Sequence, residues 1–206
     1  MHIKICGITS LQDALAAIEA GADYLGFNFY PASPRSISPG ACAEISSALI
    51  REHPQVKRVG LFVNMPTDEV RAILDGCSLD LAQLHGDEPP EELAALGTRA
   101  FKAFRGVPLE LDGCARPEAP ALLIDAAVQG AYGGTGRTAD WEGAAALAKK
   151  FPLLLAGGLN PDNVAAAVRQ VRPWGVDAAS GVESAPGRKD AGRMRAFVQA
   201  VRKSGT

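Results

Sequence analysis

The sequence predicts an α/β fold in which eight parallel strands alternate with helices and close into a barrel. Short apolar runs alternate with alanine-rich segments of helical period along the chain, which is the pattern of parallel βαβ units. The 206 residues suit a single domain of compact units, residues 1–206. The segments 153–159 and 175–183 each join a short apolar strand to a glycine-bearing loop. Barrels of this kind often bind phosphate in the loops after strands seven and eight.

The expected elements follow one another in strict alternation. Apolar runs predict strands at residues 3–6, 24–27, 58–63, 81–85, 100–104, 121–125, 153–156 and 176–178. Helical periodicity predicts helices at residues 11–20, 41–51, 67–75, 90–96, 141–150, 161–171 and 190–203. Ser10 and Asp140 are expected helix caps, as is Asn160, which precedes Pro161 at a first helical position. The prolines and Gly113 between residues 108 and 120 predict irregular chain instead of a fifth helix.

An open, doubly wound sheet is the alternative to a closed barrel. Such a sheet has two edge strands, and edge strands are usually more polar than central ones. Neither end of this chain has the composition of an edge strand, and the two glycine loops stand where a barrel would place them. These features favour the barrel, near the small end of its usual size range.

Composition limits the partners that this chain can have. A formal charge of −2 argues against electrostatic binding of nucleic acid, and no apolar run approaches the ~20 residues that span a bilayer. The first residues resemble a strand and not a signal peptide. Four scattered cysteines without a C-x-x-C pair suit reduced thiols, and the three histidines do not cluster. We therefore expect a soluble, metal-free protein of the cytoplasm.

The C-terminal strand ends are expected to carry the chemistry, as they do in barrel enzymes. Alternation places Lys4 and Cys6 on the inner face of the first strand, and Leu123 and Asp125 on that of the sixth. A thiol and a carboxyl at the barrel mouth can serve as base and acid if their surroundings tune them. The competing interpretations are a small buried residue for Cys6 and a helix cap for Asp125, although no helix is predicted to begin close to Asp125.

Three further features are candidates for the site. Gln83 and His85 share the inner face of the fourth strand, and we interpret His85 as a hydrogen-bonded residue of the barrel mouth without a chemical role. Arg35 lies in a loop stiffened by two prolines, which could aim its guanidinium at a carboxylate. The glycine-rich segment 133–137 is either a flexible turn or a lid over bound substrate. The other three cysteines, Cys42, Cys77 and Cys114, are interpreted as structural.

Ordered motifs over nearly the whole chain resemble those of one enzyme family. The resemblance begins with the segment 4–9 (KICGIT) at the first strand and includes Gly21-Ala22-Asp23 and Ser33-Pro34-Arg35. It continues through the segments 59–64 (VGLFVN), 83–86 (QLHG), 123–125 (LID) and 133–136 (GGTG). It ends with the segments 155–159 (LAGGL), 175–177 (GVD) and 180–183 (SGVE). The family that these motifs resemble is phosphoribosylanthranilate isomerase.

The resemblance implies a (βα)8 TIM barrel with a poorly formed fifth helix. It implies an Amadori rearrangement of N-(5-phosphoribosyl)anthranilate to 1-(2-carboxyphenylamino)-1-deoxyribulose 5-phosphate in tryptophan biosynthesis, an aldose–ketose isomerisation without metal or cofactor. By similarity, Cys6 is the general base, Asp125 the general acid and Arg35 the ligand of the anthranilate carboxylate. The same similarity assigns Gly157, Gly158, Ser180 and Gly181 to the phosphate, Asp177 to a ribose hydroxyl and Gly134 to the closing loop. The expected partner is the small substrate alone, with no nucleic acid or membrane, and the protein is expected to be a monomer or a homodimer.

Departures from the family pattern are few. The family usually has a second serine where this chain has Ala179, and often other residues at Ala126 and Ala139. Two rival assignments remain open at this stage. One is an isomerase of the histidine-pathway type, which would carry a carboxylate in place of Cys6. The other is a phosphate-binding barrel without catalysis, for which an inward thiol and carboxyl would have no use.

Overall fold

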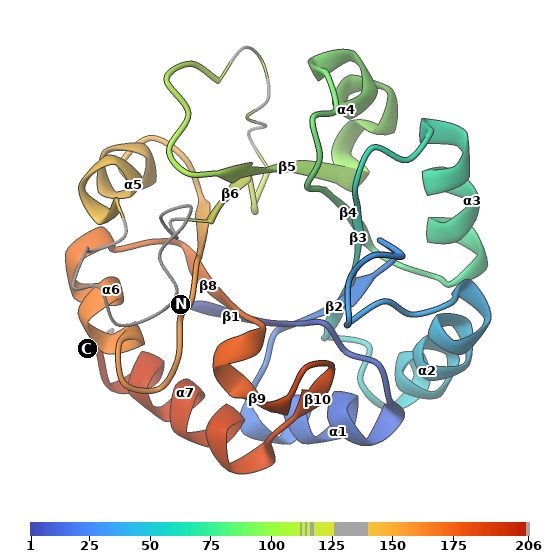
Figure 1. The fold of residues 1–206 in the computed structure, drawn as a ribbon, viewed down its shortest axis with the longest axis horizontal. Coiled ribbons are helices and arrows are strands. Elements are labelled where there is room, and N and C mark those ends of the chain that lie inside the picture. Colours follow the sequence, from blue (N-terminus) through green and yellow to red (C-terminus); the bar gives the residue numbers. More distant parts are fainter. Residues whose placement is uncertain (112, 114, 116–117, 126–139, 205–206) are drawn as a thin grey trace.

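The computed structural model describes residues 1–111, 113, 115, 118–125 and 140–204, and these form a closed barrel ringed by helices (Figure 1). Neighbouring strands from β1 to β8 are parallel, and β1 pairs with β8 to close the sheet. This closure confirms the barrel over the open sheet. The strands are β1 His2–Cys6, β2 Tyr24–Asn28, β3 Lys57–Phe62, β4 Leu81–Leu84, β5 Ala100–Arg105, β6 Leu122–Asp125, β7 Leu153–Ala156 and β8 Gly175–Ala178.

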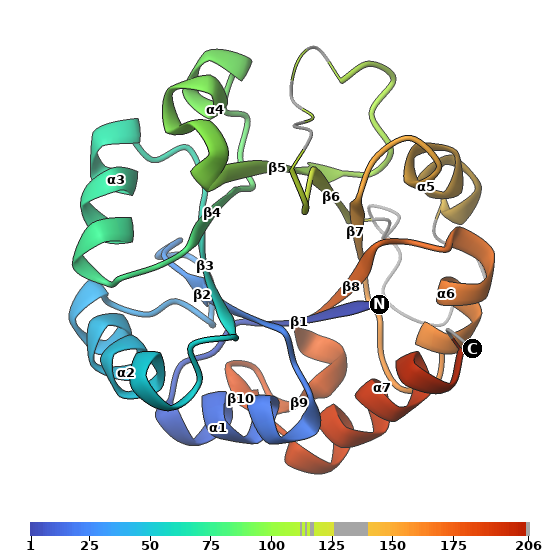
Figure 2. The same cartoon turned by 180° about the vertical axis from the view of Figure 1, so that it is seen from behind.

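The helices lie outside the barrel and cover the strands, as the view from behind also shows (Figure 2). They are α1 Leu11–Ala20, α2 Pro39–Glu52, α3 Thr67–Gly76, α4 Pro90–Leu96, α5 Trp141–Ala148, α6 Val164–Val171 and α7 Ala191–Ser204. The described residues between β5 and β6 contain no helix, so the fold is a TIM barrel with a poorly formed fifth helix, as predicted. No described helix combines the length and the apolar character that crossing a membrane requires.

Short elements that the sequence did not predict follow β8 and precede β5. The 3-10 helix η2 (Ser180–Val182) leads into an antiparallel hairpin of β9 (Glu183–Ala185) and β10 (Arg188–Lys189), and η1 (Gly97–Arg99) leads into β5. In Figure 1 the hairpin lies beside α1, at the rim of the barrel. The residues that resemble the family's phosphate loop therefore continue into a structured hairpin.

Two of the three predicted helix caps are confirmed. The side chains of Ser10 and Asp140 each accept a hydrogen bond from the backbone N–H three residues later. The prediction that Pro161 is the first residue of the next helix is wrong, because α6 begins at Val164. The Asn160 side chain accepts the N–H groups of the two residues after Pro161, so these residues form a turn that precedes the helix.

The side chains of the barrel divide into two apolar layers. Residues on the outer faces of the strands, such as Ile3 and Ile5, pack with the helices in the larger cluster. The smaller cluster fills the barrel interior and consists of Tyr24, Val59, Phe101, Ala103, Leu123, Leu154 and Ala156. The apolar side chains of the smaller cluster fill much of the barrel interior. Inward-facing polar side chains line a cavity at the C-terminal ends of the strands.

A buried ion pair fixes two of the loops at the barrel mouth. The Lys102 Nζ lies 2.5 Å from Glu88 Oε2, and the two side chains are only 7% and 1% exposed. The Glu88 carboxylate also accepts the backbone N–H groups of Asn64 and Gly86, at 2.8 and 2.9 Å. It thus joins the loop after β3 to the loop after β4.

Replacing Glu88 by alanine should lower the free energy of unfolding by about 3–5 kcal/mol, because it leaves Lys102 buried without its counter-ion. Chemical denaturation followed by circular dichroism measures this loss. The exposed pair of Arg71 and Asp68 offers a matched control, since Asp68→Ala should cost about 0–1 kcal/mol. Equal losses for the two variants would contradict a special role for the buried pair.

Candidate active site at the barrel mouth

A cavity of about 420 Å³ opens at the C-terminal ends of the strands. Of the residues predicted from the sequence it is lined by Cys6, Arg35, Asp125, Gly157, Gly158, Asp177 and Ser180. His85, Gln83 and Arg105 also line it. Gly181, which directly follows Ser180, is not among the lining residues. Gly134 lies outside the described residues, and so does the rest of the predicted lid at 133–137. The structure therefore brings the predicted thiol and carboxyl into one cavity.

A buried cation lies beside Cys6. Lys4 is fully buried, and its Nζ lies 3.1 Å from Oδ1 of Asp177, its register partner on β8. A Cβ built on Gly26 would lie 2.8 Å from Cys6 Sγ and 3.1 Å from Lys4 Nζ, so both groups occupy the space over that glycine. At position 26 of β2, any residue other than glycine would place its Cβ in the space that these two groups occupy.

Lys4 keeps its charge despite complete burial. Burial alone would lower the pKa of Lys4, but Asp177 and then Cys6 favour the ammonium form more strongly and raise this pKa above its ordinary value. Both inward predictions for β1, Lys4 and Cys6, are confirmed by this arrangement.

Asp125 approaches the same cavity from the other side of the barrel. It ends β6, which Figure 1 places across the mouth from β1. Its register partners are Arg105 on β5 and Ala156 on β7, and its backbone carbonyl accepts the N–H of Gly106 at 2.8 Å. Leu123, two residues earlier, belongs to the interior cluster. The predicted inner face of the sixth strand is thus confirmed.

His85 has the hydrogen-bonded position expected for it. Its Nδ1 lies 3.1 Å from Nε2 of Gln83, and both side chains line the cavity. Burial lowers the pKa of His85 below its ordinary value of 6.5, and the Asp125 carboxylate opposes this effect only in part. The imidazole is therefore neutral at pH 7, next to the carboxyl of Asp125.

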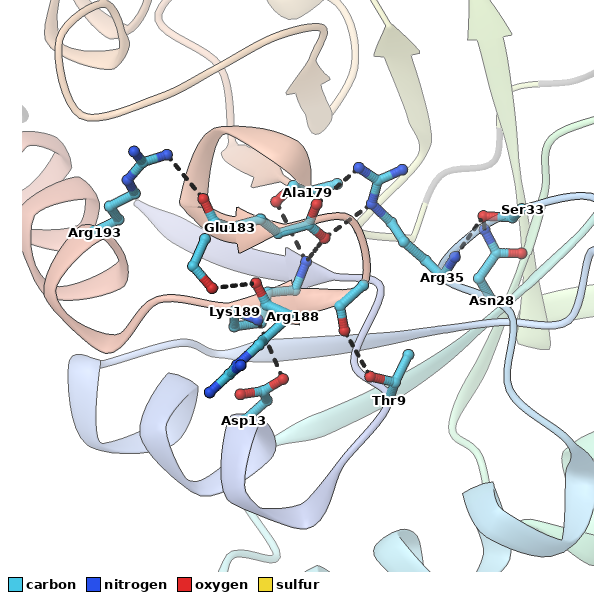
Figure 3. Close-up of polar contacts among 12 residues, drawn as sticks. Thr9, Asp13, Asn28, Ser33, Arg35, Ala179, Glu183, Arg188, Lys189 and Arg193 are labelled. Carbon is cyan, nitrogen blue, oxygen red and sulfur yellow. Dashed lines mark hydrogen bonds and ion pairs between the residues drawn. The ribbon is translucent and has the colours of Figure 1, made fainter.

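Arg35 points at a carboxylate, as its stiff loop suggested, and in the structure that carboxylate belongs to Glu183 (Figure 3). The guanidinium Nε and Nη2 lie 2.9 and 2.8 Å from the two oxygens of Glu183, which also binds Lys189 Nζ at 2.7 Å. Sequence reasoning did not assign Glu183, Lys189 or Arg105 to the site. The available signal for Glu183 was its place in the segment 180–183, next to the expected phosphate residues.

The two glycine loops meet at one end of the cavity. Gly157 and Gly158 have φ angles of 105° and 65°, which side-chain-bearing residues rarely adopt. A Cβ on Gly181 would overlap the carbonyl oxygen of Leu159, so the turn at η2 packs directly on the loop after β7. The backbone N–H groups of Gly158, Ser180 and Gly181 bind no backbone carbonyl of the described chain. Such amides are suited to binding an anion.

Comparison with known proteins identifies relatives over nearly the full chain. Residues 3–200 match the family model described as N-(5'-phosphoribosyl)anthranilate (PRA) isomerase. The enzyme of that name from Geobacter sulfurreducens is 52% identical over 200 residues, which cover 97% of each chain. Among solved structures, the phosphoribosyl anthranilate isomerase of Thermotoga maritima has a TM-score of 0.85 and 39% identity, covering 98% of this chain and 99% of its own.

A further similar structure contains a ligand. It is a phosphoribosyl anthranilate isomerase in complex with reduced 1-(o-carboxyphenylamino)-1-deoxyribulose 5-phosphate, with 37% identity and a TM-score of 0.82. It covers 98% of this chain and 99% of its own. These matches support the resemblance to phosphoribosylanthranilate isomerase over the two alternatives, an isomerase of the histidine-pathway type and a phosphate-binding barrel without catalysis.

The neutral imidazole of His85 provides a test of the cavity's electrostatics. We expect its ring protons to titrate below pH 6.5 in an NMR titration, with assignment from the His85→Gln variant. The unfolded chain takes up this proton more readily than the folded one, so the contribution of His85 to stability is lost as the pH falls from 6.5 toward the folded pKa. A folded-state pKa at or above 6.5 would contradict the burial that the structure gives this ring.

Proposed function

The chain belongs to the N-(5'-phosphoribosyl)anthranilate isomerase family, and we propose that it works by general acid–base catalysis with Cys6 as base and Asp125 as acid. It is an isomerase of tryptophan biosynthesis. The observation that carries the catalytic proposal is that Cys6 and Asp125, from β1 and β6, line the same cavity. One proton can be delivered and another removed from two sides of a bound sugar.

The rearrangement needs both of these proton transfers. Asp125 donates its proton to the furanose ring oxygen, the C1–O bond breaks, and the nitrogen lone pair forms a Schiff base with C1. Cys6 then removes the proton from C2, and the C–H electron pair forms the C1–C2 double bond of an enolamine. Tautomerisation gives the 2-ketone. The protonated Schiff base accepts the electrons within the substrate, so the proposal needs no metal or nicotinamide.

The surroundings of Cys6 support its role as base. The Lys4 ammonium is held by Asp177 and lies over Gly26 together with the sulfur. The sulfur that is proposed to accept the C2 proton therefore lies beside a fixed positive charge. The same ion pair engages Asp177, which lines the cavity, so the proposed contact of Asp177 with a ribose hydroxyl would use its remaining acceptor capacity.

The two ends of the substrate have separate proposed sites. The amides of Gly157, Gly158, Ser180 and Gly181 are proposed to hold the phosphate, and Arg35 the anthranilate carboxylate. Glu183 engages Nε and Nη2 of Arg35, which leaves Nη1 for the substrate. Ala179 lines the cavity where the family usually has a serine, so this chain has one hydroxyl fewer near the phosphate. The proposed closing role of Gly134 rests on the resemblance alone.

Removing either member of the acid–base pair tests the mechanism. We expect Cys6→Ala and Asp125→Asn each to lower kcat by at least about 10²-fold, the usual minimum for loss of a positioned acid or base. The assay follows the loss of anthranilate fluorescence as phosphoribosylanthranilate is converted. Circular dichroism and the binding of ribose 5-phosphate should remain close to those of the wild type, because neither side chain belongs to the proposed phosphate loops.

Near-normal turnover of the Cys6→Ala variant would show that the base is misassigned, and the same result for Asp125→Asn would do so for the acid. The wild-type assay is repeated with a chelator and without any added cofactor. Full activity under these conditions supports the internal electron sink, whereas restoration of lost activity by a metal would refute the metal-free mechanism.

Arg35→Met should chiefly raise KM, by about 10–100-fold, because a hydrogen bond between charged groups contributes about 1.5–3 kcal/mol. Steady-state kinetics with the anthranilate-bearing substrate measure this change. Arg51→Met is the matched control, since Arg51 is exposed on α2 away from the cavity lining. An unchanged KM for Arg35→Met would remove Arg35 from carboxylate recognition.

A further inference from the structure

Glu183 lies between two cations at the rim of the barrel, buried to all but 4% of its side chain. We infer that Glu183 is a positioning residue that holds the Arg35 guanidinium in place for the anthranilate carboxylate. This inference rests on the proposed role of Arg35 and adds a residue that neither the sequence analysis nor the proposed mechanism assigned.

The contact between Arg35 and Glu183 fixes the orientation of the guanidinium as well as its position. Two parallel hydrogen bonds, from Nε to Oε1 and from Nη2 to Oε2, join the two planar groups at 2.9 and 2.8 Å. A bidentate pair restricts rotation that a single hydrogen bond would permit. The Arg35 side chain is 23% exposed and lines the cavity, so the restricted group faces the space available to substrate.

Lys189 anchors Glu183 from the opposite side (Figure 3). Its fully buried Nζ lies 2.7 Å from Glu183 Oε1 and 3.3 Å from the carbonyl oxygen of Ala179. The backbone carbonyl of Glu183 accepts a hydrogen bond from Arg193 of α7 at 2.8 Å. Glu183 is therefore held directly by α7 and, through Lys189, by Ala179, the residue that precedes the proposed phosphate turn. The carboxylate clamp and the phosphate turn are thereby set at a fixed separation.

The charges of this cluster suit a site for an anion. Two cations, Arg35 and Lys189, share the single carboxylate of Glu183. Burial and these two partners have opposite effects on the protonation of that carboxylate. Burial alone would raise the pKa of Glu183, but hydrogen bonds from Arg35 and Lys189 outweigh this effect and lower it. Glu183 remains an anion at neutral pH, so the three side chains together carry one net positive charge, and Arg35 is the one of them that lines the cavity.

The segment that carries Arg35 is itself packed against two neighbouring loops. A Cβ on Gly7, after β1, would lie 2.7 Å from Arg35 Cδ, and a Cβ on Gly187, in the β9–β10 turn, would lie 2.7 Å from the carbonyl oxygen of Pro34. The Thr9 hydroxyl donates to the Gly187 carbonyl at 2.8 Å. The close approach that these glycines permit brings Arg35 within reach of the hairpin that carries Glu183.

The test is a double-mutant cycle between Glu183→Gln and Arg35→Met. Glutamine keeps the shape of glutamate and one acceptor oxygen, but it loses the charge and the second acceptor. We expect Glu183→Gln to raise KM about three- to tenfold with little change in kcat, because substrate binding must then order the guanidinium. In the Arg35→Met background, the same substitution should change KM by less than twofold.

A second measurement separates the two ends of the substrate. The inhibition constant of reduced 1-(o-carboxyphenylamino)-1-deoxyribulose 5-phosphate should rise with KM in Glu183→Gln. That of ribose 5-phosphate, which lacks the anthranilate group, should stay within twofold of the wild-type value. A merely structural role would instead weaken both inhibitors to a similar degree. If Glu183→Gln does not fold, Glu183→Asp replaces it, since aspartate keeps the charge but is one methylene too short to bridge both cations.

The outcomes distinguish this inference from the proposed function. If Arg35→Met leaves KM unchanged, the carboxylate clamp itself is wrong. If Arg35→Met raises KM and Glu183→Gln raises it equally in both backgrounds, Arg35 retains its role but Glu183 does not act through it. An unchanged KM in Glu183→Gln, or equal weakening of both inhibitors, also overturns the positioning role.

Discussion

The pairing of β1 with β8 is the constraint on which the site depends. It joins the first strand of the chain to the last strand of the barrel, and its register sets Lys4 directly beside Asp177. Without this closure the buried ammonium would have no counter-ion, and burial of a lone charge is costly. Closure also brings Cys6, at the end of β1, close to the turn at η2 that follows β8. The thiol and the proposed phosphate amides thus share one cavity because the sheet has no edges.

Much of this arrangement could be predicted from the sequence, because period-two alternation decides which side chains enter the barrel. The inward positions of Cys6, Asp125 and His85 followed from it, and so did the order of strands and helices. The start of α6 was misplaced, because Asn160 stabilises a turn as readily as a helix terminus. The partner of Arg35 was missed for a different reason. Glu183 is 148 residues away, and only tertiary structure places it within reach.

Among the described residues, three buried lysines at the barrel mouth each pair with a carboxylate. Lys4 pairs with Asp177, Lys102 with Glu88, and Lys189 with Glu183. These pairs hold, respectively, the strand that bears the thiol, two loops of the mouth, and the hairpin after the phosphate turn. Arg35 shares a carboxylate that Lys189 already engages, and it is more exposed than these three lysines. The cation that this shared carboxylate does not neutralise therefore includes a side chain, Arg35, that lines the cavity.

Glycines determine how closely these charged groups and loops can approach. Gly26 leaves room for both the Lys4 ammonium and the Cys6 sulfur, whereas any side chain there would displace one of them. Gly181 allows the η2 turn to rest on the carbonyl of Leu159, which keeps two sets of amides at one end of the cavity. Gly26, beside Cys6, and Gly181, beside the proposed phosphate loops, thus act in the same way. Each lacks the side chain that would prevent the close contact made there. The same pattern holds for the charged residues of the site: the Lys4 ammonium lies over Gly26, and the Arg35 side chain packs on Gly7. The charged groups could not take these positions if either glycine carried a side chain.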